Sequence, residues 1–166
     1  MSDLGYTELA YTITTQETYP GWFDMVFNHG NSVFKENWEG GLVQMPSLAG
    51  SIGWWFYYSL AGIQPSKRLA GFKEFTINPL FDRRLTHAKG EYQSLYGKII
   101  SDWKIEGDSY FLSVEVPENT SAYIHLPTAD INKIYESGKP VKGNKIFCKF
   151  KTMNGKTLFS VGSGKY

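Results

Sequence analysis

Residues 111–126, FLSVEVPENTSAYIHL, decide the fold of the larger part of this chain. Apolar residues alternate with other residues on both sides of a turn: Leu112, Val114 and Val116 before it, Ala122, Ile124 and Leu126 after it. A two-residue period places side chains on one face of a β-strand, and the intervening Pro117-Glu118-Asn119 is typical of a turn. The stretch therefore predicts two successive strands that each bury one face.

The same alternation recurs along the sequence after Pro65. Its further groups are Phe75 with Ile77, Ile99 with Trp103 and Ile105, and Ile146 with Cys148 and Phe150. The turns between the groups are Asn78-Pro79, Glu106-Gly107-Asp108, Ser137-Gly138-Lys139-Pro140 and Asn154-Gly155. Short strands separated by such turns predict an antiparallel β-sandwich over residues 65–166. Cys148, the single cysteine, is expected to be a buried core thiol.

Upstream of Gln64-Pro65-Ser66 the apolar period changes from two to that of a helix. One helix is expected to begin at Ser2 or Asp3, with Leu4, Leu9 and Ile13 on its apolar face and Tyr6 and Ala10 adding to it. A second is expected over residues 19–27 and a third over 48–60, with Gly62 as its stop. The third helix is apolar on almost its whole circumference, which is typical of a helix buried between other elements. The predicted fold class is α+β, with helices over residues 1–64 and a β-sandwich over 65–166.

Composition and charge exclude several classes of function. The 17 basic and 16 acidic residues are interspersed and give a formal charge of +1, which argues against nucleic acid and membrane surfaces as partners. No run approaches the ~18 apolar residues of a membrane span, and no signal-peptide pattern is visible, so a cytoplasmic location is the default expectation. One cysteine and three scattered histidines offer no metal-ligand spacing, and neither metal nor cofactor is predicted.

Two aromatic-rich runs carry the candidate chemistry: Tyr19-Pro20-Gly21-Trp22, and residues 34–41, FKENWEGG, which include Glu36, Trp38 and Glu39. Aromatic rings stack on the apolar faces of sugars, and a carboxylate in a dry setting can hold a water or a proton at the reacting carbon. From the residues alone, Glu36 is equally readable as a solvated turn residue, and Glu39 as a loop acid or a hydroxyl-binding group. Trp22 and Trp38 fit either a sugar wall or packing.

The other polar and aromatic residues of the chain have simpler readings. Asp24 on its short helix is expected to face solvent, and Trp54, Trp55 and Trp103 are assigned to packing.

The order and spacing of several sequence blocks resemble one known family. The blocks are QETYPGW at 16–22, ENWEG at 36–40, SIGWWFY at 51–57, LAGI at 60–63, Pro65, GFK at 71–73, INP at 77–79, YGKI at 96–99, PENT at 117–120 and VGSG at 161–164. In this order they resemble the C-terminal end of bacterial α-L-rhamnosidases of glycoside hydrolase family 78. The resemblance covers nearly the whole chain.

The resemblance implies a parent in which an (α/α)6 barrel precedes a C-terminal β-sandwich, and which hydrolyses terminal α-L-rhamnose with inversion. By position, Glu36 corresponds to the expected general base, while Trp22, Trp38 and Glu39 would bind the sugar. Lys35 and Asn37 stand where the family commonly has tryptophan and arginine. These departures leave open a relative that acts on another sugar.

An (α/α)6 barrel needs twelve helices, and the sequence predicts about three. The resemblance therefore implies a glycosidase fragment that lacks the general acid and is inactive alone. The cytoplasmic default applies to this chain, and a periplasmic or secreted parent stays open. The expected partners are a rhamnose-containing carbohydrate and either the missing helices or a second copy of the chain. The alternative hypothesis is a non-catalytic carbohydrate-binding or interaction module. Self-association through the third helix would favour the fragment.

Overall fold

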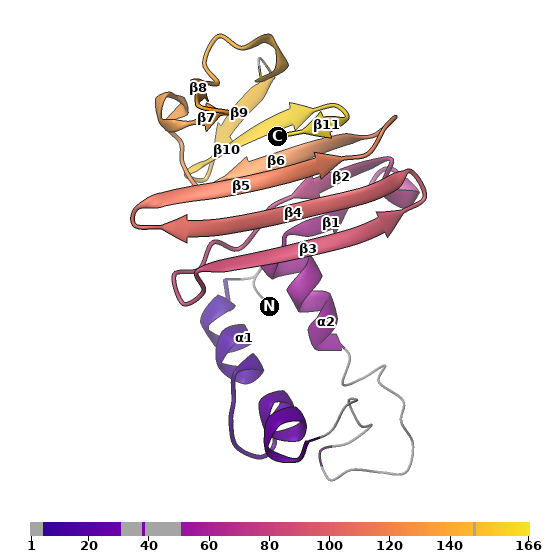
Figure 1. Ribbon diagram of the computed structural model, residues 1–166, viewed down its shortest axis with the longest axis vertical. Helices are drawn as coiled ribbons and strands as arrows, with labels where there is room; N and C mark the ends of the chain where they lie inside the picture. Colours follow the sequence, from indigo (N-terminus) through magenta and orange to yellow (C-terminus); the bar gives the residue numbers. More distant parts are fainter. Residues whose placement is uncertain (1–4, 31–37, 39–50, 148) are drawn as a thin grey trace. The chain divides into compact units, whose positions relative to one another are not determined.

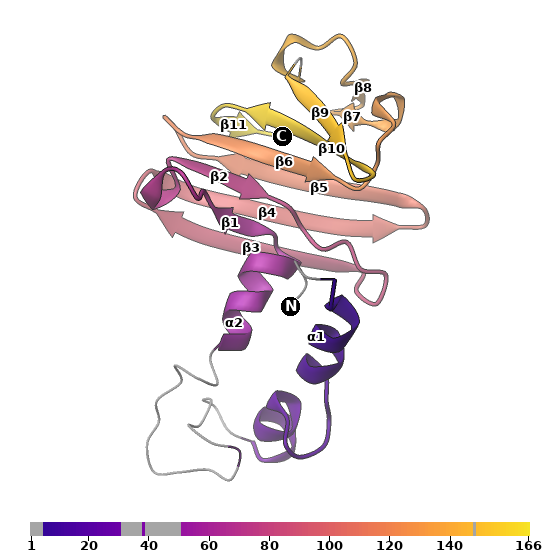
Figure 2. The ribbon, with the colours of Figure 1, turned by 180° about the vertical axis from the view of Figure 1, so that it is seen from behind.

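The computed structural model describes residues 5–30, 38, 51–147 and 149–166 (Figures 1 and 2). Its contacts divide the chain into two compact units, Met1–Trp55 and Phe56–Tyr166. The boundary that the sequence predicts at residues 64 and 65 lies within strand β1 (Ile63–Pro65) of the second unit.

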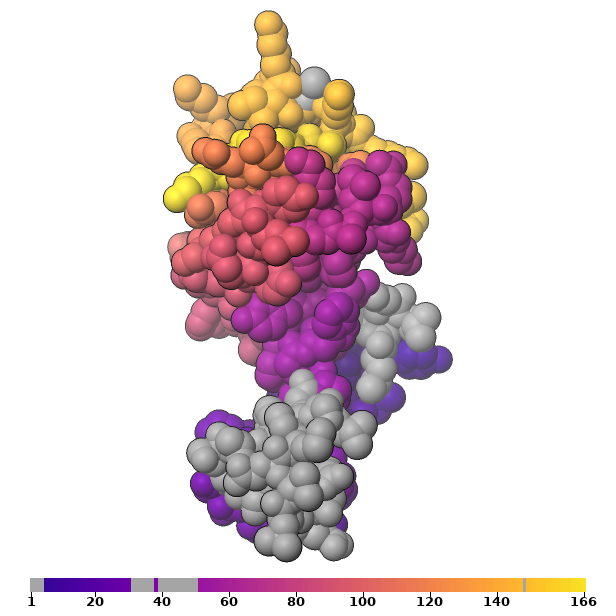
Figure 3. Space-filling model, turned by 90° about the vertical axis from the view of Figure 1, so that its right-hand side faces the viewer, coloured from indigo at the N-terminus to yellow at the C-terminus, as the bar shows by residue number. Residues whose placement is uncertain are grey.

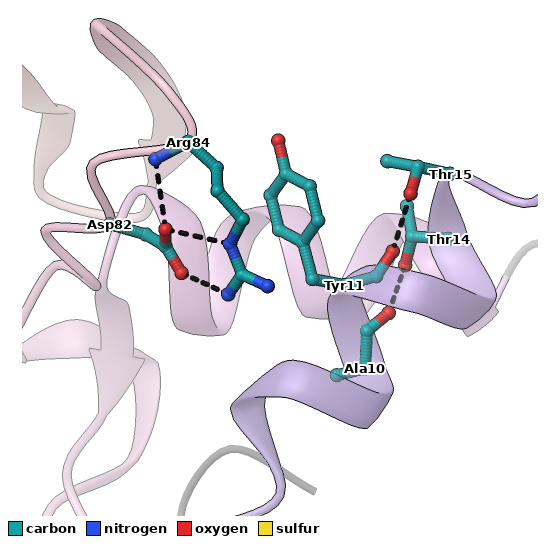
Figure 4. A network of polar contacts seen from close by, with 6 residues as sticks. All are labelled: Ala10, Tyr11, Thr14, Thr15, Asp82 and Arg84. Atoms are coloured by element: carbon teal, nitrogen blue, oxygen red, sulfur yellow. Dashed lines mark hydrogen bonds and ion pairs between the residues drawn. The ribbon is translucent and has the colours of Figure 1, made fainter.

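Helix α1 (Thr7–Thr14) of the first unit buries Ala10, as predicted. The prediction that Leu9 belongs to the same buried face is wrong, because half of its surface is exposed. The C-terminal end is closed by hydroxyls: Thr14 Oγ1 donates to the Ala10 carbonyl at 2.7 Å, and Thr15 Oγ1 donates to the Tyr11 carbonyl at 3.0 Å (Figure 4). The residues proposed to cap its start, Ser2 and Asp3, lie outside the described residues.

The second helical segment begins later than the sequence predicts, at Trp22, and continues as a π-helical turn, η2 (Asp24–Asn28). The Gln16 side-chain amide donates to the carbonyls of Thr18 and Pro20, at 3.2 and 2.8 Å. These bonds hold the preceding residues in a turn outside the helix. The predicted stop after Asn28 is confirmed.

The third helical segment is described from Ser51 onward, as α2 (Ser51–Trp55) in the first unit and the π-helical turn η3 (Phe56–Leu60) at the start of the second. Ile52 is buried, whereas Trp54 is 61% exposed and Tyr57 is 46% exposed. The expectation of burial on all sides is therefore wrong for this chain taken alone. Helical structure ends before Gly62, as predicted.

The second unit is a β-sandwich, which confirms the predicted fold class (Figures 1 and 2). One sheet has the order β1-β2-β6-β10-β9, with β2 (Glu74–Ile77), β6 (Ser121–Leu126), β9 (Phe150–Met153) and β10 (Lys156–Val161). The other has the order β11-β5-β4-β3, with β3 (His87–Ser94), β4 (Gly97–Glu106), β5 (Ser109–Val116) and β11 (Gly164–Lys165). A small hairpin of β7 (Tyr135–Glu136) and β8 (Lys139–Pro140) stands apart from both sheets. Three-residue 3-10 turns lie at Ala70–Phe72 (η4), Ile131–Lys133 (η5) and Lys145–Phe147 (η6).

The two sheets bury the alternating residues that the sequence predicts. Phe75, Ile77, Ile99 and Trp103 have no exposed surface, and Val114, Val116, Ala122 and Ile124 are at most 5% exposed. Hairpin β4–β5 has perfect pairing from Glu106 opposite Ser109 to Ile100 opposite Glu115. Burial of this apolar surface is the main term that holds the sandwich together.

Two details of the sandwich differ from the sequence-based expectation. Strands β2 and β6 pair in parallel, so the sandwich is not purely antiparallel. The predicted strand through Ile146 and Phe150 is wrong at its start, because η6 shifts the alternation: Phe147 is buried, while Ile146 is 57% exposed and Phe150 is 47% exposed. Cys148 lies outside the described residues.

Two hydrogen bonds fasten the start of the second unit onto the four-stranded sheet. The Trp103 indole Nε1 donates to the Leu60 carbonyl at 2.7 Å, and Ser101 Oγ donates to the Ala61 carbonyl at 2.6 Å. Gly90 on β3 lets this segment approach, since a Cβ there would lie 2.5 Å from the Ala61 Cβ. Trp103 is thus a packing residue, as predicted, that also makes a part-buried hydrogen bond.

Candidate functional site

The structure brings together the two tryptophans that the sequence nominates for sugar binding. The rings of Trp22 and Trp38 lie edge to face, with centroids 5.4 Å apart and an interplanar angle of 76°. Trp22 is half-buried at the start of the second helical segment, and Trp38 is 39% exposed. The pair forms an aromatic surface that remains partly exposed.

The two carboxylates nominated with them, Glu36 and Glu39, lie outside the described residues. Their roles as catalytic base and sugar-binding group remain predictions from the sequence. Trp38 lies between them in the sequence, so the described aromatic pair marks the neighbourhood in which both predictions must be tested.

The helical turn that carries Trp22 is organised around a buried carboxylate, Asp24. Its Oδ1 accepts a hydrogen bond from Asn28 Nδ2 at 3.0 Å, and its Oδ2 lies 3.3 Å from His29 Nε2. Asn28 Nδ2 also donates to the Glu17 carbonyl at 2.8 Å. Asp24 is only 8% exposed, so the expectation that it faces solvent is wrong.

Asp24 therefore holds the two ends of this turn together and supports the position of Trp22, two residues before it. A signal for this role is present in the sequence: asparagine four residues after an aspartate lies on the same face of a helix. Close packing extends to Gly21, where a Cβ would lie 2.6 Å from the Gln16 carbonyl oxygen. A side chain at position 21 would therefore force the backbone of Gln16 and Thr18 away from the start of the helical segment that carries Trp22.

Other kinds of site are not seen in the part of the chain that the structure describes. No group of three or more histidine, cysteine, aspartate or glutamate side chains there could hold a metal ion. No helix among the same residues is long and apolar enough to cross a membrane.

Comparison with known proteins agrees with the sandwich and the helices before it. The model of the bacterial alpha-L-rhamnosidase C-terminal domain matches residues 62–160. This range covers β1 to nearly all of β10. The chain belongs to this family.

Several relatives are named alpha-L-rhamnosidases. One from Formosa agariphila is 34% identical over 159 residues, which is 86% of this chain and 17% of that protein. One from Streptomyces avermitilis is 28% identical over 178 aligned positions, covering all of this chain and 16% of the relative. The chain thus spans about a sixth of the length of these relatives.

Solved structures extend the likeness to the helical segments. The Streptomyces avermitilis alpha-L-rhamnosidase, solved in complex with L-rhamnose, matches with a TM-score of 0.80 and 27% identity over 99% of this chain and 16% of that one. An enzyme of the same name from Dictyoglumus thermophilum has the same TM-score at 24% identity, which speaks for the fold alone. The fold of this chain is therefore that of the matched segment of a rhamnosidase.

Proposed function

We propose that this chain supplies the C-terminal part of a glycoside hydrolase that removes terminal α-L-rhamnose from glycans or glycosides, with Glu36 as its general base. The observation that carries the proposal is the likeness of 99% of the chain to a rhamnosidase solved with L-rhamnose, at a TM-score of 0.80. The Trp22–Trp38 pair supports it, because such rings stack on sugars and exclude water.

In this proposal the chemistry is a single displacement with inversion. Glu36 takes a proton from a water molecule as the water oxygen attacks the anomeric carbon, and the glycosidic oxygen leaves with a proton from a general acid. The acid must face the base across about 6.5–9.5 Å, which leaves room for the water. Glu39 accepts hydrogen bonds from sugar hydroxyls, and the tryptophan pair forms one wall of the subsite.

The general acid is proposed to lie in the part of the rhamnosidases that this chain does not match. Protonation of the leaving group is typically worth about 10²–10⁴-fold in rate. The 166-residue chain alone is therefore expected to hydrolyse an aryl α-L-rhamnoside negligibly. Activity of the isolated chain that disappears in Glu36→Gln would show that a working acid lies within it and would overturn this step.

A chimera tests the role of Glu36 directly. This chain replaces the matched segment of the Streptomyces avermitilis enzyme, and hydrolysis of an aryl α-L-rhamnoside is measured. We expect activity in the chimera, a fall in kcat of at least about 10²-fold in Glu36→Gln, and a rise mainly in KM in Glu39→Gln. Glu118→Gln, a change at an exposed turn residue, is the matched control and should leave both constants unchanged.

An active chimera that keeps its kcat in Glu36→Gln would contradict the assignment of the base. An active chimera that prefers another α-glycoside over the rhamnoside would contradict the substrate instead. The two outcomes therefore test the role of Glu36 and the identity of the sugar independently.

The exposed rings of the third helical segment support a protein partner for this chain. Trp54, Phe56 and Tyr57 are each more than 40% exposed. We propose that they pack against the upstream barrel of a complete enzyme, or against a second copy when the chain is alone. Sedimentation of the isolated chain should show association that weakens in Trp54→Glu, and a clean monomer that binds no apolar dye would count against this.

A further inference from the structure

The β-sandwich contains a cavity of about 760 Å³ that the proposed catalysis does not use. Its walls come from β5, from the inner faces of β6 and β10, from the β7–β8 hairpin and from the end of β11. Of these elements, the β7–β8 hairpin, β10 and β11 lie together at one end of the sandwich (Figures 1 and 3). The volume lies within the range of about 300–1,000 Å³ that small-molecule sites occupy.

Three aromatic side chains stand at the cavity with exposed surface: Tyr110 at 38%, Phe111 at 46% and Tyr135 at 62%. The Tyr110 ring is held by Phe81, edge to face at 5.2 Å, and by the Arg83 guanidinium at 5.9 Å. Two rings are thus held by neighbours, since the Phe111 ring carries the Lys104 ammonium at 5.0 Å.

Tyr135 differs from these two rings. Among the described residues its side chain has no hydrogen bond, ring contact or cation contact, although its strand pairing with Pro140 fixes the backbone. A tyrosine with a fixed backbone and an exposed ring is suited to stack on a ligand.

Hydroxyl-binding groups line the same cavity. Two carboxylates, Glu115 and Glu136, and two hydroxyls, Ser113 and Ser137, belong to its wall. Glu136 Oε1 accepts a hydrogen bond from Ser137 Oγ at 2.8 Å, and Glu115 Oε2 lies 3.2 Å from Lys165 Nζ. An ionised carboxylate has about four acceptor positions, so both glutamates retain capacity for ligand hydroxyls.

The cavity also has an apolar floor. It is formed by residues that the sandwich core contributes: Leu112, Leu126, Ile134, Val141 and Phe147. Tyr166 closes one side, with its ring 5.9 Å from that of Phe147 and its hydroxyl donating to the Gly162 carbonyl at 3.1 Å. Burial first, and then the charge of Glu136, raises the pKa of the Tyr166 phenol.

We infer that this cavity binds a neutral pyranose sugar, with its apolar face on Tyr135 and its hydroxyls donating to Glu136 and Glu115. A sugar has the required combination of an apolar face and many hydroxyls, which matches aromatic rings beside carboxylates and serines. Anionic ligands are disfavoured, because the two carboxylates of the lining outnumber its one cation, Lys165. The inference goes beyond the proposed hydrolysis and does not rest on it.

Nuclear magnetic resonance of the isotope-labelled 166-residue chain tests the inference. Methyl α-L-rhamnopyranoside and methyl β-D-glucopyranoside are titrated separately, and amide shifts are followed. We expect saturable shifts for at least one glycoside, concentrated at residues 110–115 and 134–138. An extended apolar peptide is titrated in parallel, because β11 pairs with β5 at Glu115 and Val116, and residues 109–113 on the same side of β5 are an alternative place for a strand to add.

Two variants identify the contacts. Tyr135→Ala should weaken glycoside binding at least about tenfold, and Glu136→Gln should weaken it severalfold while keeping the side-chain shape. Tyr96→Ala is the control, because Tyr96 is also an exposed tyrosine, at 40%, but is not part of the cavity lining, and the variant should bind like the parent. Spectra recorded without sugar that superimpose on those of the parent establish that each variant is folded. If Tyr135→Ala does not fold, the binding of Glu136→Gln tests the inference alone.

The inference is overturned if neither glycoside gives a saturable shift in the millimolar range, if the shifts lie elsewhere, or if Glu136→Gln binds unchanged. Binding of the peptide without either glycoside also overturns it, in favour of strand addition. Because the readout is binding to the isolated chain, failure here leaves the chimera experiment on Glu36 unaffected.

Discussion

The two units of this chain bury their aromatic residues to different degrees. In the β-sandwich, Phe75 and Trp103 have no exposed surface, and Phe159 is 2% exposed. Among the described residues of the first unit, Phe27 is 69% exposed and Trp54 is 61% exposed. The sandwich therefore has the core of an independent domain, whereas the first unit presents rings to solvent as an interface does. This difference is expected if the first unit packs against further protein, as we propose above.

The largest expected effect comes from emptying the core of the sandwich. Phe75→Ala should lower the free energy of unfolding of the second unit by about 3–5 kcal/mol, because the ring is wholly buried. Phe27→Ala removes a ring that is mostly exposed and that, among the described residues, stacks on Phe23 at 4.4 Å, and it should cost about 1 kcal/mol or less. Urea unfolding followed by circular dichroism measures both. Equal losses would contradict the proposed difference between the units.

A smaller loss is expected from the backbone at the entry to the sandwich. Gly62 has φ of +74°, its carbonyl accepts from Asn78 N at 2.9 Å, and a Cβ would lie 2.2 Å from Pro79 N. Gly62→Ala should therefore cost about 2–3 kcal/mol through strain and displacement of this backbone. Gly107→Ala is the control, with φ of +58° and nothing within 4 Å of a Cβ, and it should cost about 1 kcal/mol. A similar loss for both would mean that the close approach is easily relieved.

Sequence reasoning succeeded where local pattern decides structure. The alternation through Leu112, Val114 and Val116 gave β5, and the predicted turn at Asn154-Gly155 joins β9 to β10. It failed at Ile146, where a 3-10 turn shifts the phase of alternation by one residue, so that Phe147 is buried instead. The parallel pairing of β2 with β6 was also missed, because pairing between distant strands leaves no local period.

The candidate site was predictable in part. The sequence nominates Trp22 and Trp38 for the same sugar subsite, and the structure brings their rings together, while their role in binding sugar stays a prediction. The burial of Asp24 was missed, because a short helix with one acid gives no local sign of what will cover it. Glu36 and Glu39 stay predictions from the resemblance.

The next effect isolates one hydrogen bond of the sandwich. Trp103→Phe removes the indole N–H that donates to the part-buried Leu60 carbonyl, deprives that acceptor of this donor and creates a small void. We expect a loss of about 1–3 kcal/mol in the unfolding of the second unit. Trp54→Phe, at an exposed ring, should change stability by about 0.5 kcal/mol or less. If the two variants are equally stable, the bond at the start of the sandwich contributes little.

The smallest effect is a dependence of stability on pH. Desolvation, and then the charge of Lys156, lowers the pKa of His125 on β6, so the folded state binds its proton less readily than the unfolded state. The resulting stability is fully present above the unfolded pKa of about 6.5 and is lost as the pH falls through the lower folded value. In His125→Gln this pH dependence of the free energy of unfolding should be smaller by on the order of 0.5 kcal/mol. The effect is small because the ring is only half-buried and solvent screens it. Urea midpoints on either side of the unfolded pKa measure the slope, and the exposed His87→Gln is the control. A slope that persists in His125→Gln and vanishes in His87→Gln would assign it to the wrong side chain, and would place the pH sensitivity at the edge strand β3 instead of within the five-stranded sheet.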